Sequence, residues 1–240
     1  MGLEINNHID ELEKNGLTFF SNYFSSAQCS NFKSKAEEIK IRLEKDKNFD
    51  FKNDSYHIDN YFIYDDEMLD LVLVSPIDNI LKILLNEDYV LTHTNLINRV
   101  NLNNKNQTKV SHAGHWHSDS RYLNRKRLSR GFSYILIIML DPFTISNGAT
   151  QYVPHSFKHD DFPERYGDYE YKSMTGDPGT MCLFDSSLWH RGGISNDVGS
   201  RWSVYSQFGP AFMKPYYMYP KIFSEVFYNK LNPNQKKIFH

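Results

Sequence analysis

The sequence is poor in cysteine and has no long apolar run, and both shortages exclude whole classes of protein. Only two cysteines, Cys29 and Cys182, occur in 240 residues. A disulfide framework or a zinc ribbon is therefore excluded, and we expect a reduced, cytoplasmic location. The longest apolar run covers residues 134–140, far short of the ~20 residues that a membrane helix needs. No basic segment followed by an apolar one begins the chain, so we predict no signal peptide.

An excess of charge of either sign is also missing. The 27 lysines and arginines against 29 aspartates and glutamates leave a formal net charge of −2. Such a balance provides no general affinity for nucleic acid or anionic lipid. We therefore expect a small-molecule substrate and neither a nucleic-acid nor a membrane partner, and the oligomeric state stays open. Aromatic residues are abundant instead, with 16 tyrosines and 17 phenylalanines, which favours strands and an aromatic-lined cavity.

Helical periodicity is confined to the first ~90 residues, about a third of the chain. Residues 5–12 predict a short helix that ends near Gly16, a suitable C-terminal cap. Ser25 and Gln28 have the spacing of a capping box. A second amphipathic helix follows them, with apolar residues at Cys29, Phe32, Ala36, Ile39 and Leu43. Residues 67–87 predict another helix, which we expect Pro76 to interrupt and Ser75 to cap.

Short apolar runs alternate with turn signals from residue 89 onwards. We expect strands over residues 89–101, 132–140, 149–153, 170–174, 180–184 and 201–209. Several strands without intervening helices are typical of an antiparallel sandwich or barrel. We therefore predict a mainly β fold with flanking helices, in a single catalytic domain spanning residues 1–240. The helical part lies mainly within residues 1–88 and the β core within about residues 89–215.

His117 and Asp119 are two residues apart, so on one strand both side chains point to the same face. With a distant histidine, His190, they form the 2-His-1-carboxylate set that leaves metal positions open in non-heme Fe(II) oxygenases. Arg201 follows eleven residues later inside an apolar strand. A buried arginine there needs an anion, and its planar fork suits a carboxylate. The alternative pair His115 and His117 leaves no carboxylate at the right spacing.

Several motifs carry a resemblance to a known family. They are Trp116-His117-Ser118-Asp119 with Tyr122, the segments at residues 147–154 and 176–185, Trp189-His190-Arg191-Gly192-Gly193, Asn196 and Arg201. Together they resemble the phytanoyl-CoA dioxygenase (PhyH-like) family of Fe(II)/2-oxoglutarate oxygenases.

The resemblance implies a double-stranded β-helix, a jelly-roll or cupin-like barrel. It implies that His117, Asp119 and His190 bind Fe(II) and form the catalytic centre. It also implies that Arg201 binds 2-oxoglutarate, with O2 as the second co-substrate. Asn101 and Tyr122 are further candidates for contacts with 2-oxoglutarate.

Two departures from the family pattern and one agreement with it bear on the reaction. Residues 154–157 read Pro-His-Ser-Phe, where family members usually have Pro-Gly-Ser-His, and this change is expected to alter substrate contacts. Gly192 stands where a small hydroxyl residue is common, which removes one co-substrate hydrogen bond. Asp119 is intact, whereas halogenating relatives have alanine or glycine there. The sequence therefore favours oxygen insertion over halogenation.

A run of basic residues begins two positions after Asp119. It comprises Arg121, Arg125, Lys126, Arg127 and Arg130. The run is either a solvated loop or part of the substrate site, where Arg121 or Arg125 would hold a carboxylate or phosphate. Arg99 is a further candidate for substrate binding. The aromatic stretch at residues 212–219 is either a packed tail or a lid.

The expected reaction is hydroxylation of an unactivated C–H bond in a small polar or anionic metabolite, with release of succinate and CO2. Desaturation, epimerisation and cyclisation use the same kind of centre and remain alternatives. A cupin-like metal oxidase or isomerase without 2-oxoglutarate is a rival within the enzymes, and it would not need Arg201. A rival of another class is a catalytically silent cupin-like barrel that binds a ligand or acts as a sensor.

Overall fold

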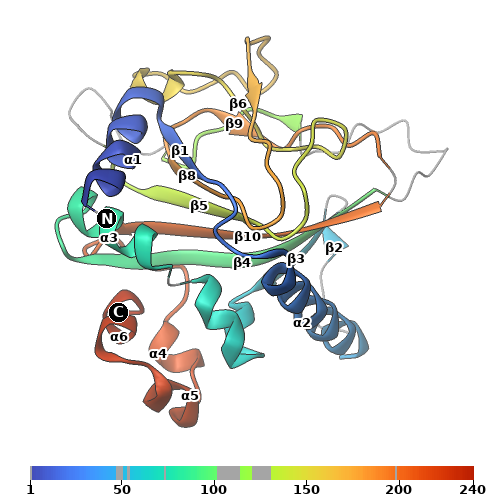
Figure 1. The fold of residues 1–240 in the computed structure, drawn as a ribbon, viewed down its shortest axis with the longest axis vertical. Helices are drawn as coiled ribbons and strands as arrows, with labels where there is room; N and C mark the ends of the chain where they lie inside the picture. The colour runs from blue at the N-terminus through green and yellow to red at the C-terminus, as the bar shows by residue number, and fades with distance from the viewer. Residues whose placement is uncertain are drawn as a thin grey trace.

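Two antiparallel sheets form the centre of the molecule (Figure 1). The computed structural model describes residues 2–46, 51–52, 55–72, 74–101, 114–120, 131–197 and 199–240. The larger sheet has the strand order β1-β8-β5-β10-β4-β3-β2, and the smaller one has the order β7-β6-β9. The prediction of a mainly β fold with flanking helices is confirmed.

The strands are β1 (Leu17–Phe20), β2 (Phe51–Lys52), β3 (Ser55–Asp59), β4 (Tyr89–Asn101), β5 (Tyr134–Met139), β6 (Gln151–Tyr152), β7 (Lys172–Ser173), β8 (Met181–Asp185), β9 (His190–Arg191) and β10 (Gly199–Pro210). The helices are α1 (Gly2–Asn15), α2 (Ser26–Lys45), α3 (Ser75–Leu84), α4 (Tyr219–Ile222), α5 (Glu225–Lys230) and α6 (Pro233–Ile238). Short 3-10 turns cover Tyr61–Ile63, Asp66–Leu71 and Ser156–Lys158. No helix among these described ranges is long and apolar enough to cross a bilayer.

The N-terminal helices follow their sequence signals closely. The predicted capping box is present, because the Ser25 side chain accepts from the Gln28 backbone and the Gln28 side chain accepts from Ser25. The predicted apolar face of α2 is buried. The helix expected over residues 67–87 is divided into a 3-10 turn and α3, as Pro76 suggested. The expected cap at Ser75 was wrong: the Asp78 N–H bonds the Val74 carbonyl, so Ser75 already lies inside the first turn.

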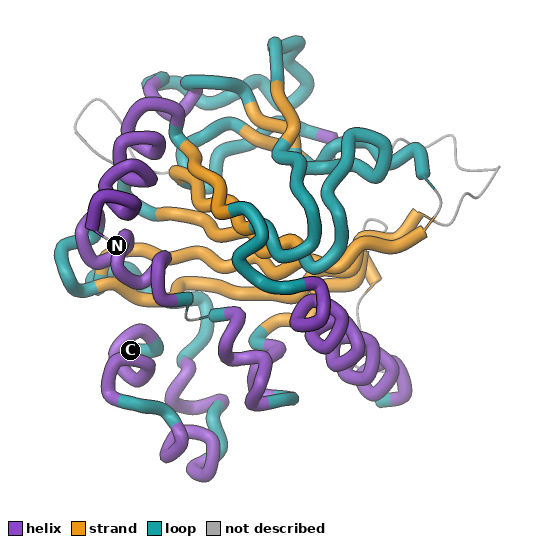
Figure 2. The backbone as a smooth tube through the Cα atoms, viewed as in Figure 1, coloured by secondary structure: helices purple, strands orange, loops and turns teal. Residues whose placement is uncertain are grey.

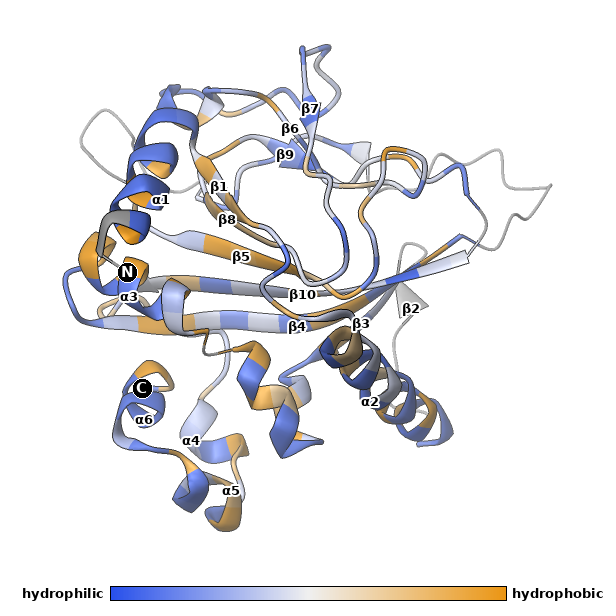
Figure 3. Cartoon of the chain, in the orientation of Figure 1, coloured by the Kyte–Doolittle hydropathy of each residue, from blue (hydrophilic) through white to orange (hydrophobic). Residues whose placement is uncertain are grey.

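The large sheet has one face on the helices and one on the small sheet (Figure 2). Alternation along each strand sends neighbouring side chains to opposite faces. On β5, for example, Leu136 and Ile138 join the core that includes α2 and α3, whereas Ile135 and Ile137 join the core beneath the small sheet. All six residues of β5 are therefore buried, and Figure 3 shows how apolar this strand is.

The longest strand pair, β4 with β10, determines which residues share the inner face of the sheet. It runs antiparallel over the full length of both strands, with one irregularity between Gln207 and Phe208. Arg201 lies directly opposite Arg99 in this register, and Tyr205 lies opposite Asn95. Residues from two distant parts of the sequence are thereby paired across one surface.

The C-terminal helices α4 to α6 lie on the side of the large sheet opposite the small sheet (Figure 1). Their aromatic residues pack around Phe62, and Tyr219 is completely buried there. Phe212 and Tyr216, by contrast, are 77% and 73% exposed. The stretch at residues 212–219 is thus a packed tail at its end and an exposed aromatic segment at its start.

Gly179 should be one of the least replaceable residues outside the pocket. Its φ is +88°, and a Cβ there would lie 1.9 Å from the carbonyl oxygen of Phe24. Left-handed strain and overlap with backbone both act against a side chain. We expect Gly179→Ala to lower the free energy of unfolding by about 2 kcal/mol or more, measured by urea denaturation.

Gly199 provides the matched control for this substitution. Its φ is also positive, at +142°, but a Cβ there would meet nothing within 4 Å. Gly199→Ala should therefore destabilise the protein less than Gly179→Ala. Equal effects of the two substitutions would show that the contact with Phe24 is unimportant.

Candidate metal and co-substrate site

Three side chains with metal-binding atoms meet above the inner face of the large sheet. The ligand atoms of His117, Asp119 and His190 all lie within 4.8 Å of one another. His117 and His190 are joined by reciprocal backbone hydrogen bonds of 3.0 and 2.9 Å, and the Asp119 N–H bonds the Ser186 carbonyl at 2.9 Å. The expectation that His117 and Asp119 share a strand was wrong, since His117 forms only an isolated bridge. Both side chains nevertheless turn to the same side.

The hydrogen bonds of His117 and His190 involve Nδ1, so Nε2 of each ring remains available to bind a metal. Nδ1 of His190 lies 2.8 Å from the Leu188 carbonyl oxygen, and Nδ1 of His117 lies 3.2 Å from the His115 carbonyl oxygen. A carbonyl oxygen only accepts hydrogen bonds, so each neutral ring carries its proton on Nδ1. In the neutral form of each ring the Nε2 lone pair therefore faces the cluster, as a metal ligand requires.

The charge states of Asp119 and His117 also suit a metal. Burial, together with the charge of His190, lowers the pKa of His117 to about 4. Burial alone would raise the pKa of Asp119, but its hydrogen bond and charge interaction with His190 lower it to about 2. Burial acts to lower the pKa of His190, and the facing Asp119 outweighs it and raises that pKa. Near neutral pH the site thus offers an ionised carboxylate beside a neutral His117, which are the ligating forms.

Tyr205 is a neighbour of the cluster that the sequence patterns did not single out. Its hydroxyl donates to Asp119 Oδ2 at 3.2 Å and lies 3.4 Å from His190 Nε2. Burial, followed by the charge of Asp119, raises the pKa of Tyr205 well above its ordinary value, so the phenol keeps its proton. The alternation of β10 could have revealed it, because Tyr205 shares a face with Arg201.

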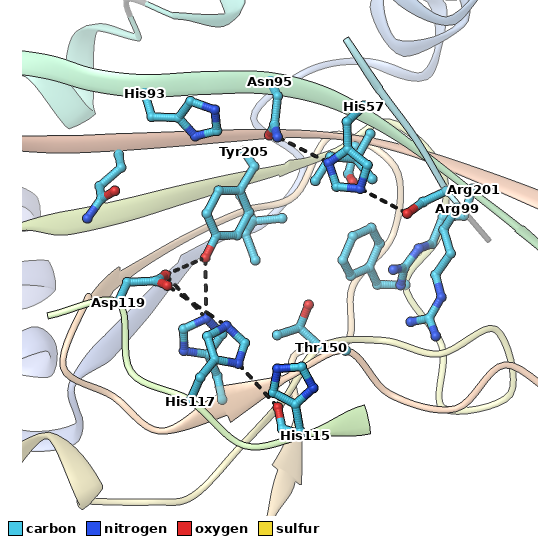
Figure 4. Close-up of a pocket in the computed structure, with 18 of the residues that line it drawn as sticks. His57, His93, Asn95, Arg99, His115, His117, Asp119, Thr150, Arg201 and Tyr205 are labelled. Atoms are coloured by element: carbon cyan, nitrogen blue, oxygen red, sulfur yellow. Dashed lines mark hydrogen bonds and ion pairs between the residues drawn. The ribbon is translucent and has the colours of Figure 1, made fainter. Parts of the chain in front are cut away.

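The cluster lies in a cavity of ≈ 520 Å³ (Figure 4). Arg201 also lines this cavity and is only 8% exposed. Its Nε and Nη1 atoms have no hydrogen-bond partner among the described residues, and its guanidinium carbon lies 3.6 Å from the centre of the Phe143 ring. Burial and the nearby charge of Arg99 lower the pKa of Arg201 to about 9. A buried cation with open donors is suited to an anionic ligand.

The other candidate residues from the sequence have different positions. Arg99 lines the cavity opposite Arg201, and its Nη1 donates to the Gly148 carbonyl at 3.0 Å. Asn101 is further along β4, where its amide donates to the Ser195 carbonyl at 3.0 Å, and it is not among the residues that line the cavity. His115 lines the cavity but is outside the cluster. The remaining candidates, Tyr122, Arg121 and Arg125, lie outside the described residues.

Four polar residues of the cavity wall were missed by the sequence patterns. They are His57 on β3, His93 and Asn95 on β4, and Gln207 on β10. For His93 and Asn95 the available signal was the alternation of polar residues within the predicted strand at residues 89–101. That signal does not by itself say whether such a face is turned to solvent or to a cavity.

Curated relatives match only part of the chain. An uncharacterized protein of Mycobacterium tuberculosis is 32% identical over 84 residues, which is 33% of this chain and 29% of that protein. An uncharacterized protein of Mycobacterium bovis matches with the same values. The matched segment is thus less than a third of the length of these relatives.

Solved structures share the fold over most of the chain. The epimerase SnoN, in complex with Fe3+, alpha ketoglutarate and nogalamycin RO, has a TM-score of 0.68 at 12% identity and covers 90% of this chain and 88% of its own. HygX from Streptomyces hygroscopicus, with nickel and 2-oxoglutarate bound, has a TM-score of 0.67 at 15% identity and covers 88% and 89%. EctD from S. alaskensis, with bound Fe, has a TM-score of 0.70 at 16% identity and covers 87% and 79%.

A sequence model provides the assignment to a family. The model of phytanoyl-CoA dioxygenase (PhyH) matches residues 12–200, most of the chain and all three residues of the cluster. The expected jelly-roll fold agrees with this match and with the similar structures. The chain belongs to the phytanoyl-CoA dioxygenase family.

Proposed function

We propose that this chain is an Fe(II)- and 2-oxoglutarate-dependent oxygenase that hydroxylates an unactivated C–H bond of a small polar or anionic metabolite and releases succinate and CO2. In this proposal His117, Asp119 and His190 hold Fe(II), and Arg201 holds the far carboxylate of 2-oxoglutarate. The observation that supports it best is the presence, in one cavity, of the three-residue cluster and a buried arginine with open donors. A ligand that chelates a metal at one end and carries a carboxylate at the other would occupy the cluster and Arg201 together.

Each residue has a distinct part in this reaction. Fe(II) and 2-oxoglutarate, when bound, supply the oxidising chemistry. The two Nε2 lone pairs and the Asp119 carboxylate would hold the metal, as a set of ligands typical of non-heme Fe(II) oxygenases. The Tyr205 hydroxyl holds Asp119 Oδ2 by its hydrogen bond and so orients the carboxylate. Phe143 covers the Arg201 guanidinium and shields it from water, which strengthens its interaction with a carboxylate.

The remaining candidates keep their proposed roles. Asn101 and Tyr122 are proposed contacts of 2-oxoglutarate, although Asn101 already bonds the Ser195 carbonyl. If the substrate is anionic, Arg99, Arg121 and Arg125 are the residues proposed to hold its negatively charged group.

The reaction outcome is the part of the proposal most open to variation. Proteins of the same fold are described as an epimerase, SnoN, and as a carbocyclase, SnoK. HygX has been solved with nickel, 2-oxoglutarate and hygromycin B bound. The alternatives of epimerisation and cyclisation therefore remain beside hydroxylation. The product mass separates them: hydroxylation adds one oxygen atom, epimerisation leaves the mass unchanged, and cyclisation or desaturation removes two hydrogen atoms.

The test is reconstitution of the protein with Fe(II) and 2-oxoglutarate without oxygen. A screen for succinate release then follows in air, over amino acids, sugars, phosphonates and acyl thioesters. We expect one substrate class to raise succinate release well above the level without substrate. Product formation that needs iron but no 2-oxoglutarate would indicate a cupin-like oxidase instead. A protein that binds no Fe(II) would be a silent ligand-binding barrel.

A further inference from the structure

The cavity side chains of β4 and β10 form a series of facing pairs. The pairs are Arg99 with Arg201, Ile97 with Ser203, Asn95 with Tyr205, and His93 with Gln207. The Tyr205 hydroxyl contacts Asp119 and His190, so the pair of Asn95 and Tyr205 lies at the same position along the cavity as the metal cluster. The two arginines lie on one side of that position, and His93 with Gln207 lies on the other.

The two ends of the cavity differ in charge. The end of Arg99 and Arg201 is cationic and suits the carboxylate of 2-oxoglutarate. At the opposite end the described wall offers the imidazole of His93, the amide of Gln207 and the aromatic ring of Tyr216. No lysine or arginine lies there within the described part of the wall. This end is therefore built for hydrogen bonds to an uncharged group.

Asn95, at the level of the cluster, has a hydrogen-bond partner for its amide nitrogen but none for its amide oxygen among the described residues. The residue is 7% exposed, and its Nδ2 lies 3.3 Å from Nδ1 of His57. The other nitrogen of that ring, Nε2, lies 2.9 Å from the Ser55 hydroxyl. Asn95 Oδ1 has no hydrogen-bond partner among the described residues. A buried acceptor of this kind costs free energy unless a ligand supplies a donor.

The Asp59 carboxylate fixes the orientation of the His93 ring. Its Nε2 lies 3.5 Å from Asp59 Oδ1, and the Tyr217 hydroxyl donates to the other oxygen of Asp59. The Tyr217 ring stacks on His93 with 6.2 Å between ring centres and 18° between planes. With Nε2 directed at Asp59, Nδ1 is the atom of His93 that a ligand can use. Tyr216, 5.3 Å from His93, adds an exposed ring at the rim.

We propose that this end of the cavity binds an uncharged polyhydroxylated ring, a sugar or cyclitol, as the substrate of the proposed oxygenase. Hydroxyl groups both donate and accept, which matches Asn95 Oδ1, His93 Nδ1 and the Gln207 amide. The apolar C–H face of such a ring packs on an aromatic side chain, here Tyr216. The inference rests on the proposed function and narrows its substrate from polar or anionic to polar and uncharged.

The test uses the full chain loaded with Zn(II) and 2-oxoglutarate, so that no turnover occurs. Saturation-transfer NMR would compare myo-inositol and methyl glucoside with their charged counterparts, inositol phosphate, glucuronate and glucose 6-phosphate. We expect the neutral members to receive saturation and the anionic members to receive little. Binding should weaken about tenfold or more in Asn95→Ala and in His93→Ala, since each removes a hydrogen bond to the ligand.

Tyr216 allows a matched comparison that does not disturb the core. Tyr216→Ala should weaken binding of the neutral probes, whereas Tyr216→Phe should preserve it, because the ring and not the hydroxyl makes the contact. Tyr166→Ala is the control, since Tyr166 is 77% exposed and does not line the cavity. It should leave binding unchanged.

Two outcomes would overturn the inference while leaving the proposed function intact. One is that 2-oxoglutarate and metal bind but none of the neutral probes does. The other is a preference for the anionic probes, which would direct attention to the basic residues 121–130. Failure of metal and 2-oxoglutarate binding in calorimetry would instead contradict the proposed function itself.

Discussion

Arg201→Ala is expected to abolish measurable 2-oxoglutarate binding and 2-oxoglutarate-dependent succinate release. Loss of a buried partner of a charged ligand costs about 2–5 kcal/mol, which corresponds to roughly 30-fold to several thousand-fold weaker binding. Arg201 is 8% exposed, and its open Nε and Nη1 atoms are the donors that a carboxylate would lose. Calorimetry of 2-oxoglutarate with the iron-loaded protein under anaerobic conditions measures the effect directly.

The same substitution should not unfold the protein. Without its ligand, Arg201 is a buried cation whose Nε and Nη1 lack partners among the described residues, so its removal costs little or even stabilises the free chain. Arg201→Lys should retain part of the affinity, because lysine keeps the charge but not the planar fork. We therefore expect Arg201→Ala to unfold at the normal temperature but to show no measurable binding of 2-oxoglutarate.

Arg99→Ala tests whether the correct arginine has been assigned. The two residues face each other across β4 and β10, but the Arg99 guanidinium already bonds the Gly148 carbonyl. We expect Arg99→Ala to weaken 2-oxoglutarate binding less than Arg201→Ala. The reverse order would transfer the co-substrate carboxylate to Arg99.

His117→Ala should remove Fe(II) binding, and His115→Ala should preserve it. Changes to residues that only support a metal ligand already weaken metal binding by roughly 10–100-fold, and loss of a ligand should exceed that. His115 supports His117 through its backbone carbonyl, which accepts from Nδ1 of His117 at 3.2 Å. Alanine at position 115 keeps that carbonyl, so only the imidazole is lost.

Anaerobic Fe(II) titration and the rise in Tm caused by the metal provide two independent measurements of this pair. The unsubstituted protein and His115→Ala should both gain stability on metal binding, and His117→Ala should gain none. A comparable loss in His115→Ala would favour the alternative in which His115 and His117 both bind the metal.

Local signals accounted for much of the secondary structure. Ser25 and Gln28 predicted where α2 begins, and the expected strand over residues 89–101 coincides with β4. The failures were also local in origin. Ser75 looked like a cap because of the proline after it, but the Asp78 to Val74 hydrogen bond begins α3 one residue earlier. His117 looked like part of a strand, yet it pairs only with His190.

The composition of the cluster was open to prediction because its chemistry depends on residue types and spacing. His117 and Asp119 stand two apart, and His190 and Arg201 return later in the chain. Asn95, His93 and Tyr205 were not open to prediction in this way, because polar and aromatic residues in a strand are common on solvated faces. Their relation to the cluster depends on the register between β4 and β10.

By itself, the sequence determined the kind of elements, the metal-binding residue types and the family resemblance. Only the tertiary structure decided that Arg99 and Arg201 share one end of the cavity, whereas the described wall of the other end has no lysine or arginine. The physical reason is that helix caps and strand alternation act between near neighbours in the chain. The ends of the cavity arise from pairing between β4 and β10, whose facing residues Arg99 and Arg201 are about a hundred positions apart.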